Sequence, residues 1–334
     1  MMNNNVPVDI VLTWVNGNDE DWLEQRAFWI KKSGRIEDEK QLDIRFRDWD
    51  NIQYVFRGIE KFMPWVRNLY FVTWGHLPAW INSKNSKLII VNHKDYIPKE
   101  FLPTFNSNVI ELNFHRIDGL SEKYINFNDD MFIIRETRET DFFVDDLPRD
   151  MACISPIYIQ NSAITNIQLN NLKIVNKYYS VSDIKKNLNK WINPFLYGKY
   201  MLRTLFLMNF STIVGLYEPH IPFSHLKGTL VDLWSKEGGY LNHICQNRFR
   251  EVNECNEWLI RDLQILSGKF VPRSYRFGKM VFSSDYGGIA KSLNDKKCKI
   301  LCINDAGEEA FDRSKEVING LLASILPEKS SFEV

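Results

Sequence analysis

The stretch DIVLTWVNGNDEDW, residues 9–22, carries the local signals that decide how the fold begins. The surrounding run Val6–Val15 is rich in β-branched residues and predicts a strand, which the turn pair Asn16-Gly17 ends. A helix is expected over Asp19–Lys32, because apolar residues recur on one of its faces. Strand, turn and helix in this order predict the first unit of an α/β fold.

Strands and helices continue to alternate as far as residue 130. Strands are expected over Asn68–Trp74, Leu88–Asn92 and Lys123–Phe127, and helices over Asp50–Phe62 and Ser107–Arg116, which Ser107 would cap. This alternation predicts fold class α/β, with a mostly parallel sheet flanked by helices. A ligand site is then expected at the carboxyl ends of the strands.

The pattern weakens in the second half of the chain. Residues 151–210 have patchy hydrophobicity and many Asn and Lys residues, which indicates a helical insertion or cap. Helices are expected over Leu226–Glu237, Asn256–Ser267 and Glu308–Leu326, and a strand over Lys299–Ile303. We interpret residues 1–334 as one domain, and the sequence assigns no role to residues 270–334.

Composition excludes some classes of protein. Lys and Arg total 42, as do Asp and Glu, and this balance argues against wholesale nucleic-acid binding. The five Cys are scattered, which indicates free thiols in a reducing compartment. Cys298 and Cys302 have neither a matching second pair nor a nearby His, so their spacing disfavours zinc. We expect a cytoplasmic protein, because we find neither a signal peptide nor an apolar run long enough to span a membrane.

Polar residues follow two of the predicted strands. Asn16, Gly17 and Asp19 would present backbone N–H groups and hydrogen-bonding side chains to a nucleotide, or they are simply a β-turn and a helix cap. The strand Lys123–Phe127 ends in Asn128-Asp129-Asp130, and the adjacent carboxylates of Asp129 and Asp130 could hold Mg²⁺, which takes oxygen ligands. The alternative for this acidic pair is a solvated turn.

A third group of polar residues lies on the helix expected over Ser107–Arg116. Glu111 and His115 are four residues apart and would share a face, as a metal ligand and a general base, and Arg116 could clamp a phosphate. An ordinary surface pair explains the same spacing. The group also includes Asn106 and Ser107.

Three more residues are candidates for the same chemistry. His220 stands between two prolines in EPHIP, and Arg248 and Arg250 flank Phe249. A lone His is more often structural, and arginines often pair with neighbouring acids, so the sequence leaves both interpretations open.

Taken together and in this order, these segments resemble the Stealth family of polysaccharide phosphotransferases. The first motif is Asp9–Trp22, and the second runs from Arg45 to Phe132 with the segments RFRDWDN and LPTFNSNVIELNFHRIDGLSEKYINFNDDMF. A third region is loosely visible over Tyr179–Asn209, and a fourth is QNRFR at Gln246–Arg250. This chain departs from the family's RDN pattern at RDWDN, residues 47–51, which blurs whether Asp48 or Asp50 is the equivalent residue.

The resemblance implies a nucleotide-sugar-transferase fold of Rossmann-like type and transfer of an intact sugar phosphate. Hexose-1-phosphate would move from a UDP-sugar to a hydroxyl of a polysaccharide or lipid-linked oligosaccharide acceptor, forming a phosphodiester and releasing UMP. The alternatives are a metal-dependent glycosyltransferase that releases UDP and a non-catalytic sugar-binding subunit.

The resemblance also implies roles for the candidate residues. Glu111, Asp129 and Asp130 would hold Mg²⁺ or Mn²⁺, and Arg116, Arg248 and Arg250 would bind phosphate oxygens. His115 or His220 would accept the proton of the acceptor hydroxyl. The nucleotide sugar would be bound by Asn16, Gly17, Asp19, Asn106 and Ser107. A lipid-linked acceptor would bring the protein to the inner face of the cytoplasmic membrane. The basic and apolar segment Lys199–Met208 could contact that membrane, or it could be a core helix.

Overall fold

A computed structural model of the chain describes residues 6–35, 46–159, 163–307 and 311–334. Its main sheet has the strand order β3-β2-β1-β4-β8. These strands are β1 (Val8–Thr13), β2 (Leu69–Thr73), β3 (Leu88–Asn92), β4 (Lys123–Phe127) and β8 (Phe223–Leu226). The first four in spatial order run parallel, and β8 is antiparallel to β4. The predicted α/β class and the mostly parallel sheet are confirmed.

Two smaller sheets complete the strand inventory of the described residues. One has the order β10-β11-β5 and the other β6-β7-β9. Their strands are β5 (Met131–Ile133), β6 (Phe143–Val144), β7 (Leu147–Asp150), β9 (Val271–Pro272), β10 (Gly278–Phe282) and β11 (Ile300–Asn304). Because β5 follows β4 after a short turn and pairs with β11, the C-terminal segment 270–334 is tied to the carboxyl end of β4. That pairing gives the segment, to which the sequence assigned no role, a place beside the main sheet.

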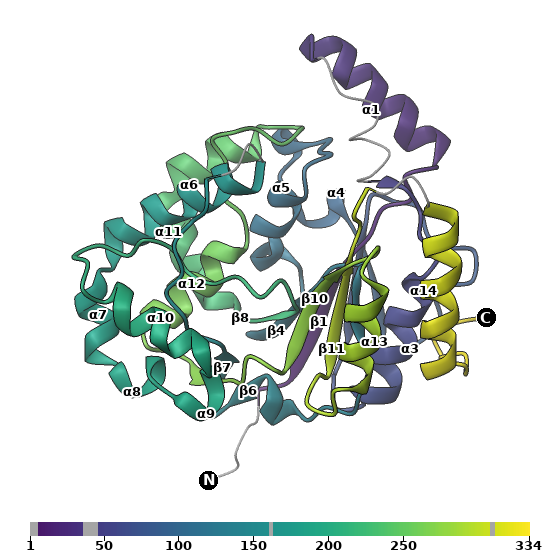
Figure 1. Cartoon of the computed structure of the whole chain (residues 1–334). Helices are drawn as coiled ribbons and strands as arrows, with labels where there is room; N and C mark the ends of the chain where they lie inside the picture. The colour runs from purple at the N-terminus through teal and green to yellow at the C-terminus, as the bar shows by residue number, and fades with distance from the viewer. Residues whose placement is uncertain (1–5, 36–45, 160–162, 308–310) are drawn as a thin grey trace.

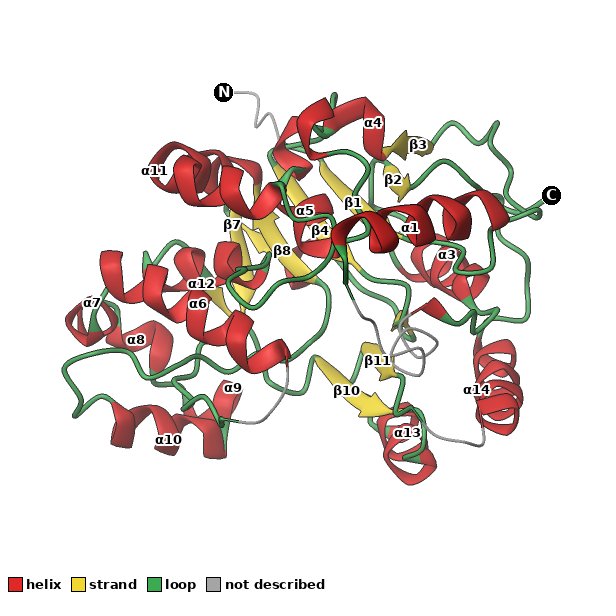
Figure 2. Ribbon diagram, turned by 90° about the horizontal axis from the view of Figure 1, so that it is seen from above, coloured by secondary structure: helices red, strands yellow, loops and turns green. Residues whose placement is uncertain are grey.

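Helices cover both faces of the main sheet (Figures 1 and 2). On one side lie α3 (Ile52–Phe62), α13 (Tyr286–Asn294) and α14 (Phe311–Ile325). On the other lie α4 (His93–Tyr96), α5 (Ser107–Leu112), α11 (Lys227–Cys245) and α12 (Trp258–Leu266), together with α6 (Ala163–Tyr178), α7 (Val181–Lys186), α8 (Leu188–Trp191), α9 (Pro194–Tyr197) and α10 (Lys199–Leu207). Helix α1 (Glu20–Ser33) projects from the rest of the molecule (Figure 1). The described residues also form three short 3₁₀ helices: η1 (Lys99–Phe101), η2 (Phe114–Arg116) and η3 (Glu139–Asp141).

The central strand β1 explains why both faces need cover. Successive side chains of a strand point to opposite faces, and Val8–Leu12 are all buried. Val11 belongs to the core beneath α11 and α12, whereas Ile10 and Leu12 belong to the core beneath α3 and α14. Burial of successive residues on both faces therefore marks a strand in the middle of a doubly covered sheet.

Two predicted helices were wrong in their extent. The helix over Ser107–Arg116 ends as an α-helix at Leu112, and Asn106, not Ser107, caps it by accepting a hydrogen bond from Asn108 N. The side chain of Asn113 donates to Val109 O at 2.8 Å and accepts from Arg116 Nε at 2.9 Å, so it competes with continued helical hydrogen bonding. Glu111 and His115 consequently do not share one face of an α-helix.

The other correction concerns α11, which continues past Glu237 to Cys245. Glu237 has φ −120° and ψ 21°, outside the helical region, and Gly238-Gly239 follow it. The glycines let the chain bend there and resume the helix. The closing helix was predicted from Glu308; residues 308–310 lie outside the described residues, and α14 begins at Phe311. Among the residues described, no helix has the length and apolar character needed to cross a membrane.

Candidate active site

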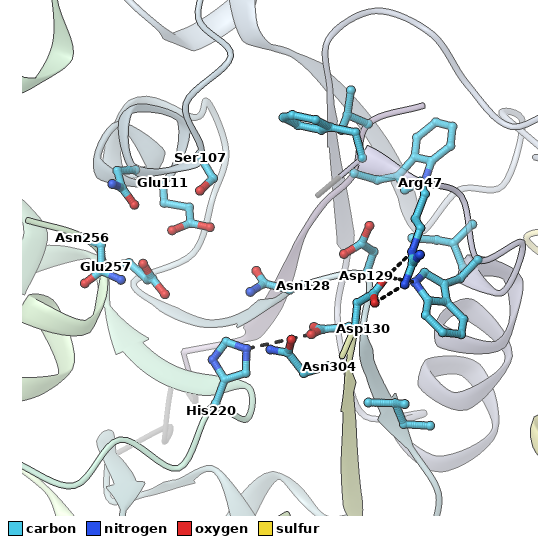
Figure 3. Close-up of a pocket in the computed structure, with 18 of the residues that line it drawn as sticks. Arg47, Ser107, Glu111, Asn128, Asp129, Asp130, His220, Asn256, Glu257 and Asn304 are labelled. Carbon is cyan, nitrogen blue, oxygen red and sulfur yellow. Dashed lines mark hydrogen bonds and ion pairs between the residues drawn. The ribbon is translucent and has the colours of Figure 1, made fainter. Parts of the chain in front are cut away.

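A cleft opens at the carboxyl ends of β1 and β4, where the parallel sheet predicted a ligand site. It has two adjoining parts, of about 360 Å³ and 260 Å³, which share Trp14 after β1, Asp129 and Asp130 after β4, Glu111 of α5, and Arg250. The larger part is also lined by His220, by Glu257 before α12 and by Asp305 after β11. Distant segments of the chain therefore meet around one space (Figure 3).

The turn after β4 forms one wall of the cleft. Asp129 opens onto the cleft, yet protein atoms surround it, and this desolvation together with the charge of Asp130 raises the pKa of Asp129 to about 7. Asp130 Oδ2 lies 3.9 Å from His220 Nε2 and accepts a hydrogen bond from Cys302 Sγ at 3.3 Å. Asp130 Oδ1 is buried and has no hydrogen-bond partner among the described residues. This wall therefore carries a carboxylate oxygen, Asp130 Oδ1, that is buried and lacks a hydrogen bond among the described residues.

A second acidic pair faces this turn across the cleft (Figure 3). Glu111 is buried and hydrogen-bonded to Glu257, and its pKa is raised well above the usual range, first by burial and then by the neighbouring Glu257 carboxylate. Burial and the neighbouring charge both favour the protonated form of Glu111. Arg250 offsets part of that charge and donates from Nη2 to Ser107 Oγ at 2.6 Å. Glu111 thus has Glu257 and Arg250 as charged neighbours, and Asp129 has Asp130 and Asp48.

His220 reaches the cleft from the loop before β8. Its φ is 47°, a left-handed conformation that is unusual for a residue other than glycine. Glu218, two residues earlier, is held by the buried Arg261, whose Nη1 donates to Glu218 Oε2 at 2.9 Å. Burial lowers the pKa of His220, but the nearby Asp130 carboxylate and then the charge of Glu257 outweigh it, so the net pKa is raised. Observed strain of this kind is often found at functional positions.

The smaller part of the cleft is more aromatic. Phe105 and Phe249 stack with ring centroids 5.4 Å apart and planes 11° apart, and Trp22 packs edge-on against Phe105 at 5.7 Å. These rings line the space together with Arg26 and Phe46. An aromatic lining with a cation beside it suits a planar, anionic ligand such as a nucleotide.

The C-terminal segment closes the larger part of the cleft. Asp305 follows β11, forms an ion pair with Arg47 and accepts from Trp49 Nε1 at 3.0 Å. Asp48 lines the cleft, whereas Asp50 is 74% exposed in its side chain and lies 3.4 Å from Lys315. In the RDWDN segment it is therefore Asp48 that faces the acidic turn after β4.

Several predicted site residues lie in this cleft and others do not. Those that line it are Ser107, Glu111, Asp129, Asp130, His220 and Arg250. Those that do not are Asn16, Gly17, Asp19, Asn106, His115, Arg116 and Arg248. What these residues do to a ligand stays a prediction, but their contacts separate them into two groups.

The residues of the N-terminal turn support a wall of the cleft from outside it. Asp19 caps α1 by accepting from Trp22 N at 2.9 Å, and Asn16 N donates to His76 Nε2 at 2.7 Å. A Cβ on Gly17 would come within 2.0 Å of Phe46 O, and Phe46 lines both parts of the cleft. Gly17 thus permits a close backbone approach that places Phe46.

The remaining predicted residues are held elsewhere. Asn106 is fully buried and donates from Nδ2 to Glu254 Oε1 at 2.8 Å. His115 packs at 5.5 Å against Trp234, and burial, then the charge of Arg116, lowers its pKa to about 4. Arg116 also lies over Trp234, at 4.8 Å, and Arg248 lies 3.9 Å over the ring of Trp29.

Some residues of the cleft were missed in the sequence. Asp305 comes two residues after the predicted strand Lys299–Ile303, just as Asp129 comes two residues after Lys123–Phe127, and it could have been found in that way. Glu257 and Cys302 had no such signal, because they become neighbours of Glu111 and Asp130 only through tertiary packing.

Comparisons with known proteins agree with the order of the motifs. Residues 6–34 match Stealth protein CR1, conserved region 1, and residues 45–150 match Stealth protein CR2, conserved region 2. The chain is 42% identical over 335 residues to the capsular polysaccharide phosphotransferase WcwK of Streptococcus pneumoniae, with 99% of each chain covered. It is 37% identical over 335 residues to the receptor polysaccharide phosphotransferase WefC of Streptococcus oralis, with 98% of this chain and 99% of the relative covered.

Among solved structures, the galactosyltransferase LgtC in complex with donor and acceptor sugar analogs aligns with 97% of this chain and 98% of its own. The TM-score is 0.38 and the sequence identity is 11%, a likeness that carries no argument about the site.

Proposed function

The chain belongs to the Stealth family of polysaccharide phosphotransferases and is a transferase enzyme, and from that premise we propose the reaction that its cleft performs. It transfers hexose-1-phosphate from a UDP-sugar to a hydroxyl of a polysaccharide or lipid-linked oligosaccharide acceptor, in the synthesis of a capsule or another surface polysaccharide. The acceptor oxygen forms a bond to the β-phosphorus, the bond from that phosphorus to the bridging oxygen breaks, and UMP leaves. The product is a phosphodiester.

The placement of His220 against Asp130 is the observation that carries this proposal. In-line attack on phosphorus requires a group that takes the proton of the acceptor hydroxyl, and the Nε2 atom of His220 faces the cleft wall beside Asp130. The Asp130 carboxylate, 3.9 Å away, stabilises the imidazolium that forms when the proton arrives. His115, the other predicted base, packs against Trp234 outside the cleft, so we assign the base to His220.

Arg250 and the Glu111–Glu257 pair are the proposed contacts of the donor. Arg250 belongs to both parts of the cleft and can place its guanidinium along the diphosphate, where planar two-pronged hydrogen bonding favours Arg over Lys. The carboxyl oxygens of Glu111 and Glu257 can accept hydrogen bonds from hydroxyls of the transferred hexose. The uracil ring would pack against the aromatic lining of the smaller part of the cleft, which includes Phe105 and Phe249.

Residues of the acidic turn fit a divalent cation. Asp130 Oδ1 is a desolvated oxygen that lacks a partner among the residues described, and Asp129 and Asp48 add carboxylate charge beside it. We propose that Asp129 and Asp130 hold Mg²⁺ or Mn²⁺, and that Glu111, which the sequence placed in the same set, binds sugar from the opposite wall. When bound, the cation would neutralise charge on the donor diphosphate.

The nucleotide that is released tests the reaction. The wild-type protein is incubated with a panel of UDP-sugars and extracted lipid-linked acceptor, and nucleotide products are separated by chromatography. UMP together with an acceptor-linked phosphodiester is the expected result. Release of UDP would instead establish a glycosyltransferase, and no acceptor-dependent nucleotide with any donor would support a sugar-binding subunit. The matched variant His220→Gln should release neither nucleotide above background.

Attachment to a membrane surface is a further part of the proposal. Helices α9 and α10 expose Phe195 at 95%, Leu202 at 64% and Phe206 at 71%, while Thr204 and Leu207 of α10 are buried. The core-helix interpretation therefore applies to one face of α10 only. Exposed Lys199 on α10 and Lys185 on α7 are available to anionic headgroups, which favours a bilayer over an uncharged apolar partner.

Flotation with vesicles tests this attachment. The protein should float with vesicles that contain anionic lipid at low salt and remain at the bottom at high salt. The double variant Leu202→Ser/Phe206→Ser should lose flotation, whereas Val317→Ser, an exposed apolar position on α14, should keep it. A wild-type protein that stays at the bottom at low salt would overturn the membrane contact and leave the phosphotransfer reaction untouched.

A further inference from the structure

Three side chains with different metal-binding atoms meet at the base of the cleft. Asp130 follows β4, His220 precedes β8, and Cys302 lies within β11. A carboxylate oxygen, an imidazole nitrogen and the thiol sulfur of these residues all lie within 4.8 Å of one another. Cys298 and Cys302 lack a nearby His in the sequence, but folding supplies Cys302 with His220 from a distant segment.

The strand pairings hold these three atoms in place. Cys302 lies opposite Met131 in the β11–β5 pair, which sets it beside Asp130 at the preceding position. His220 is anchored through Glu218 to the buried Arg261. The site thus draws on rigid elements and on a loop that is itself fixed, and preorganised ligands of this kind favour ion binding.

The distances fit a small tetrahedral ion. Tetrahedral ligand bonds to zinc of about 2.0–2.3 Å place neighbouring ligand atoms about 3.3–3.8 Å apart. Asp130 Oδ2 lies 3.3 Å from Cys302 Sγ and 3.9 Å from His220 Nε2, and all three ligand atoms lie within 4.8 Å of one another, so side-chain rotations can bring them to these spacings. Three protein ligands leave a fourth position, which opens toward the cleft that Asp130 and His220 line.

The chemistry of the ligands selects the class of ion. Mg²⁺ prefers an all-oxygen environment, whereas thiolate and imidazole favour Zn²⁺ and related transition-metal ions. We propose that Asp130, His220 and Cys302 form a binding site for Zn²⁺ or a similar transition-metal ion, which shares Asp130 with the proposed carboxylate site for Mg²⁺ but adds nitrogen and sulfur ligands. On binding, the Cys302 thiol gives its proton to solvent and its sulfur becomes a ligand.

Occupation of this site has a consequence for transfer. Because His220 Nε2 would be a ligand, it could no longer accept a proton. Asp130 would bind the ion instead of stabilising the His220 imidazolium or holding Mg²⁺. The ion is therefore an inhibitor that acts at the base of the cleft. This consequence rests on the proposed function, whereas the binding of the ion does not.

Cobalt spectroscopy tests the site without any substrate. Co²⁺ is added to the full chain, and absorption is recorded in the near ultraviolet, where thiolate-to-cobalt charge transfer appears, and in the visible region, where tetrahedral Co²⁺ absorbs. We expect one Co²⁺ per chain with both features, and Zn²⁺ should abolish them by displacement. Cys302→Ser should lose the charge-transfer band and bind Zn²⁺ at least tenfold more weakly.

Cys298→Ser is the matched control, because Cys298 is also buried but donates to Ile300 O, away from Asp130. It should keep the charge-transfer band. Absence of the band from the folded wild type, or its persistence in Cys302→Ser, would overturn the site. Zn²⁺ should also inhibit the wild type in excess Mg²⁺, with a midpoint near the Kd of Zn²⁺ measured at the same Mg²⁺ concentration. Full turnover at saturating Zn²⁺ would overturn the inhibitory consequence, while the cobalt band decides the site independently.

Discussion

The Nε2 atom of His220 lies 3.9 Å from Oδ2 of Asp130, because β4 and β8 run antiparallel. Asn126 pairs with Phe223 in that register, so the residues after β4 and those before β8 emerge at the same edge of the sheet. The antiparallel strand at the end of a parallel sheet thus brings a histidine to an acidic turn. The predictions that follow depend on this cleft and on the walls that shape it.

Removal of the proposed base should abolish turnover without abolishing donor binding. His220→Gln is expected to lower kcat by about 10²–10⁴-fold, the usual contribution of general base catalysis. Initial rates of UMP release measure this effect, and calorimetric titration with UMP measures binding. His115→Gln is the control, since His115 packs against Trp234 outside the cleft. An active His220→Gln protein would show that a carboxylate accepts the proton.

Turnover should require a divalent cation held by the acidic turn. Asp130→Asn is expected to reduce kcat at least ~100-fold, because phosphoryl transfer depends on charge neutralisation. Rates are measured across a range of Mg²⁺ and Mn²⁺ concentrations and in excess chelator. Asp50→Asn should change them little, because Asp50 points to Lys315 at the surface. Full activity of the wild type in chelator would contradict the cation requirement.

The two arginines around Phe249 should differ in effect. Arg250→Lys keeps the charge but loses the planar fork, and we expect the donor KM to rise roughly ten- to hundredfold, as for a lost charged hydrogen bond of about 1.5–3 kcal/mol. Arg248→Lys should leave the donor KM nearly unchanged, because Arg248 lies over Trp29. Steady-state kinetics with varied UDP-sugar measures both. A larger effect of Arg248→Lys than of Arg250→Lys would contradict this proposal and indicate that the diphosphate binds near Arg248.

A methyl group at position 17 should disturb the wall that Phe46 forms. The Cβ of Gly17→Ala would meet Phe46 O at 2.0 Å, so the segment must shift. We expect the free energy of unfolding to fall by about 1–3 kcal/mol, as for overpacking, and UMP to bind more weakly. Gly238→Ala is matched to it, since its Cβ meets no atom within 4 Å. Unfolding in urea and UMP titration compare them, and equal effects of both variants would refute the role of Gly17.

The buried His225 should make stability fall in acid. Burial lowers the pKa of His225 to about 3, and neither ring nitrogen has a hydrogen-bond partner among the described residues. Below its ordinary value of about 6.5, the imidazole takes up a proton only in the unfolded chain, so the free energy of unfolding decreases as the pH falls. Between pH 7 and pH 5 the wild type should lose about 2 kcal/mol more than His225→Phe.

Urea unfolding at both pH values measures that difference, in which contributions from other titrating groups cancel. Tyr124→Phe is the control. Tyr124 lies opposite His225 in the β4–β8 pair, and this substitution leaves the His225 imidazole in the protein. Its pH dependence should follow the wild type. Parallel curves for the wild type and His225→Phe would mean that His225 takes up its proton equally in the folded and the unfolded chain.

Much of the secondary structure could be predicted from the sequence because it depends on residues that are close together in the chain. The apolar run of β1, the helix cap Asp19 and the strand Lys123–Phe127 depend on neighbouring residues, and the structure confirms these elements. The helix ending at Leu112 was misjudged because Asn113 diverts its side chain to the backbone, a competition that propensities do not record. Local signals also placed Asp129 and Asp130 at the end of a strand, and hence at the cleft.

By itself, then, the sequence determined the α/β class, the strand that ends in an acidic turn, and the membership of the family. Tertiary structure alone decided which candidates meet: it joined His220 to Asp130, Glu111 to Glu257 and Cys302 to the same turn, and it set His115 and Arg248 apart. Secondary structure follows from interactions within a few residues. The distant residues that a side chain contacts depend on strand order and register, which combine segments from the whole chain.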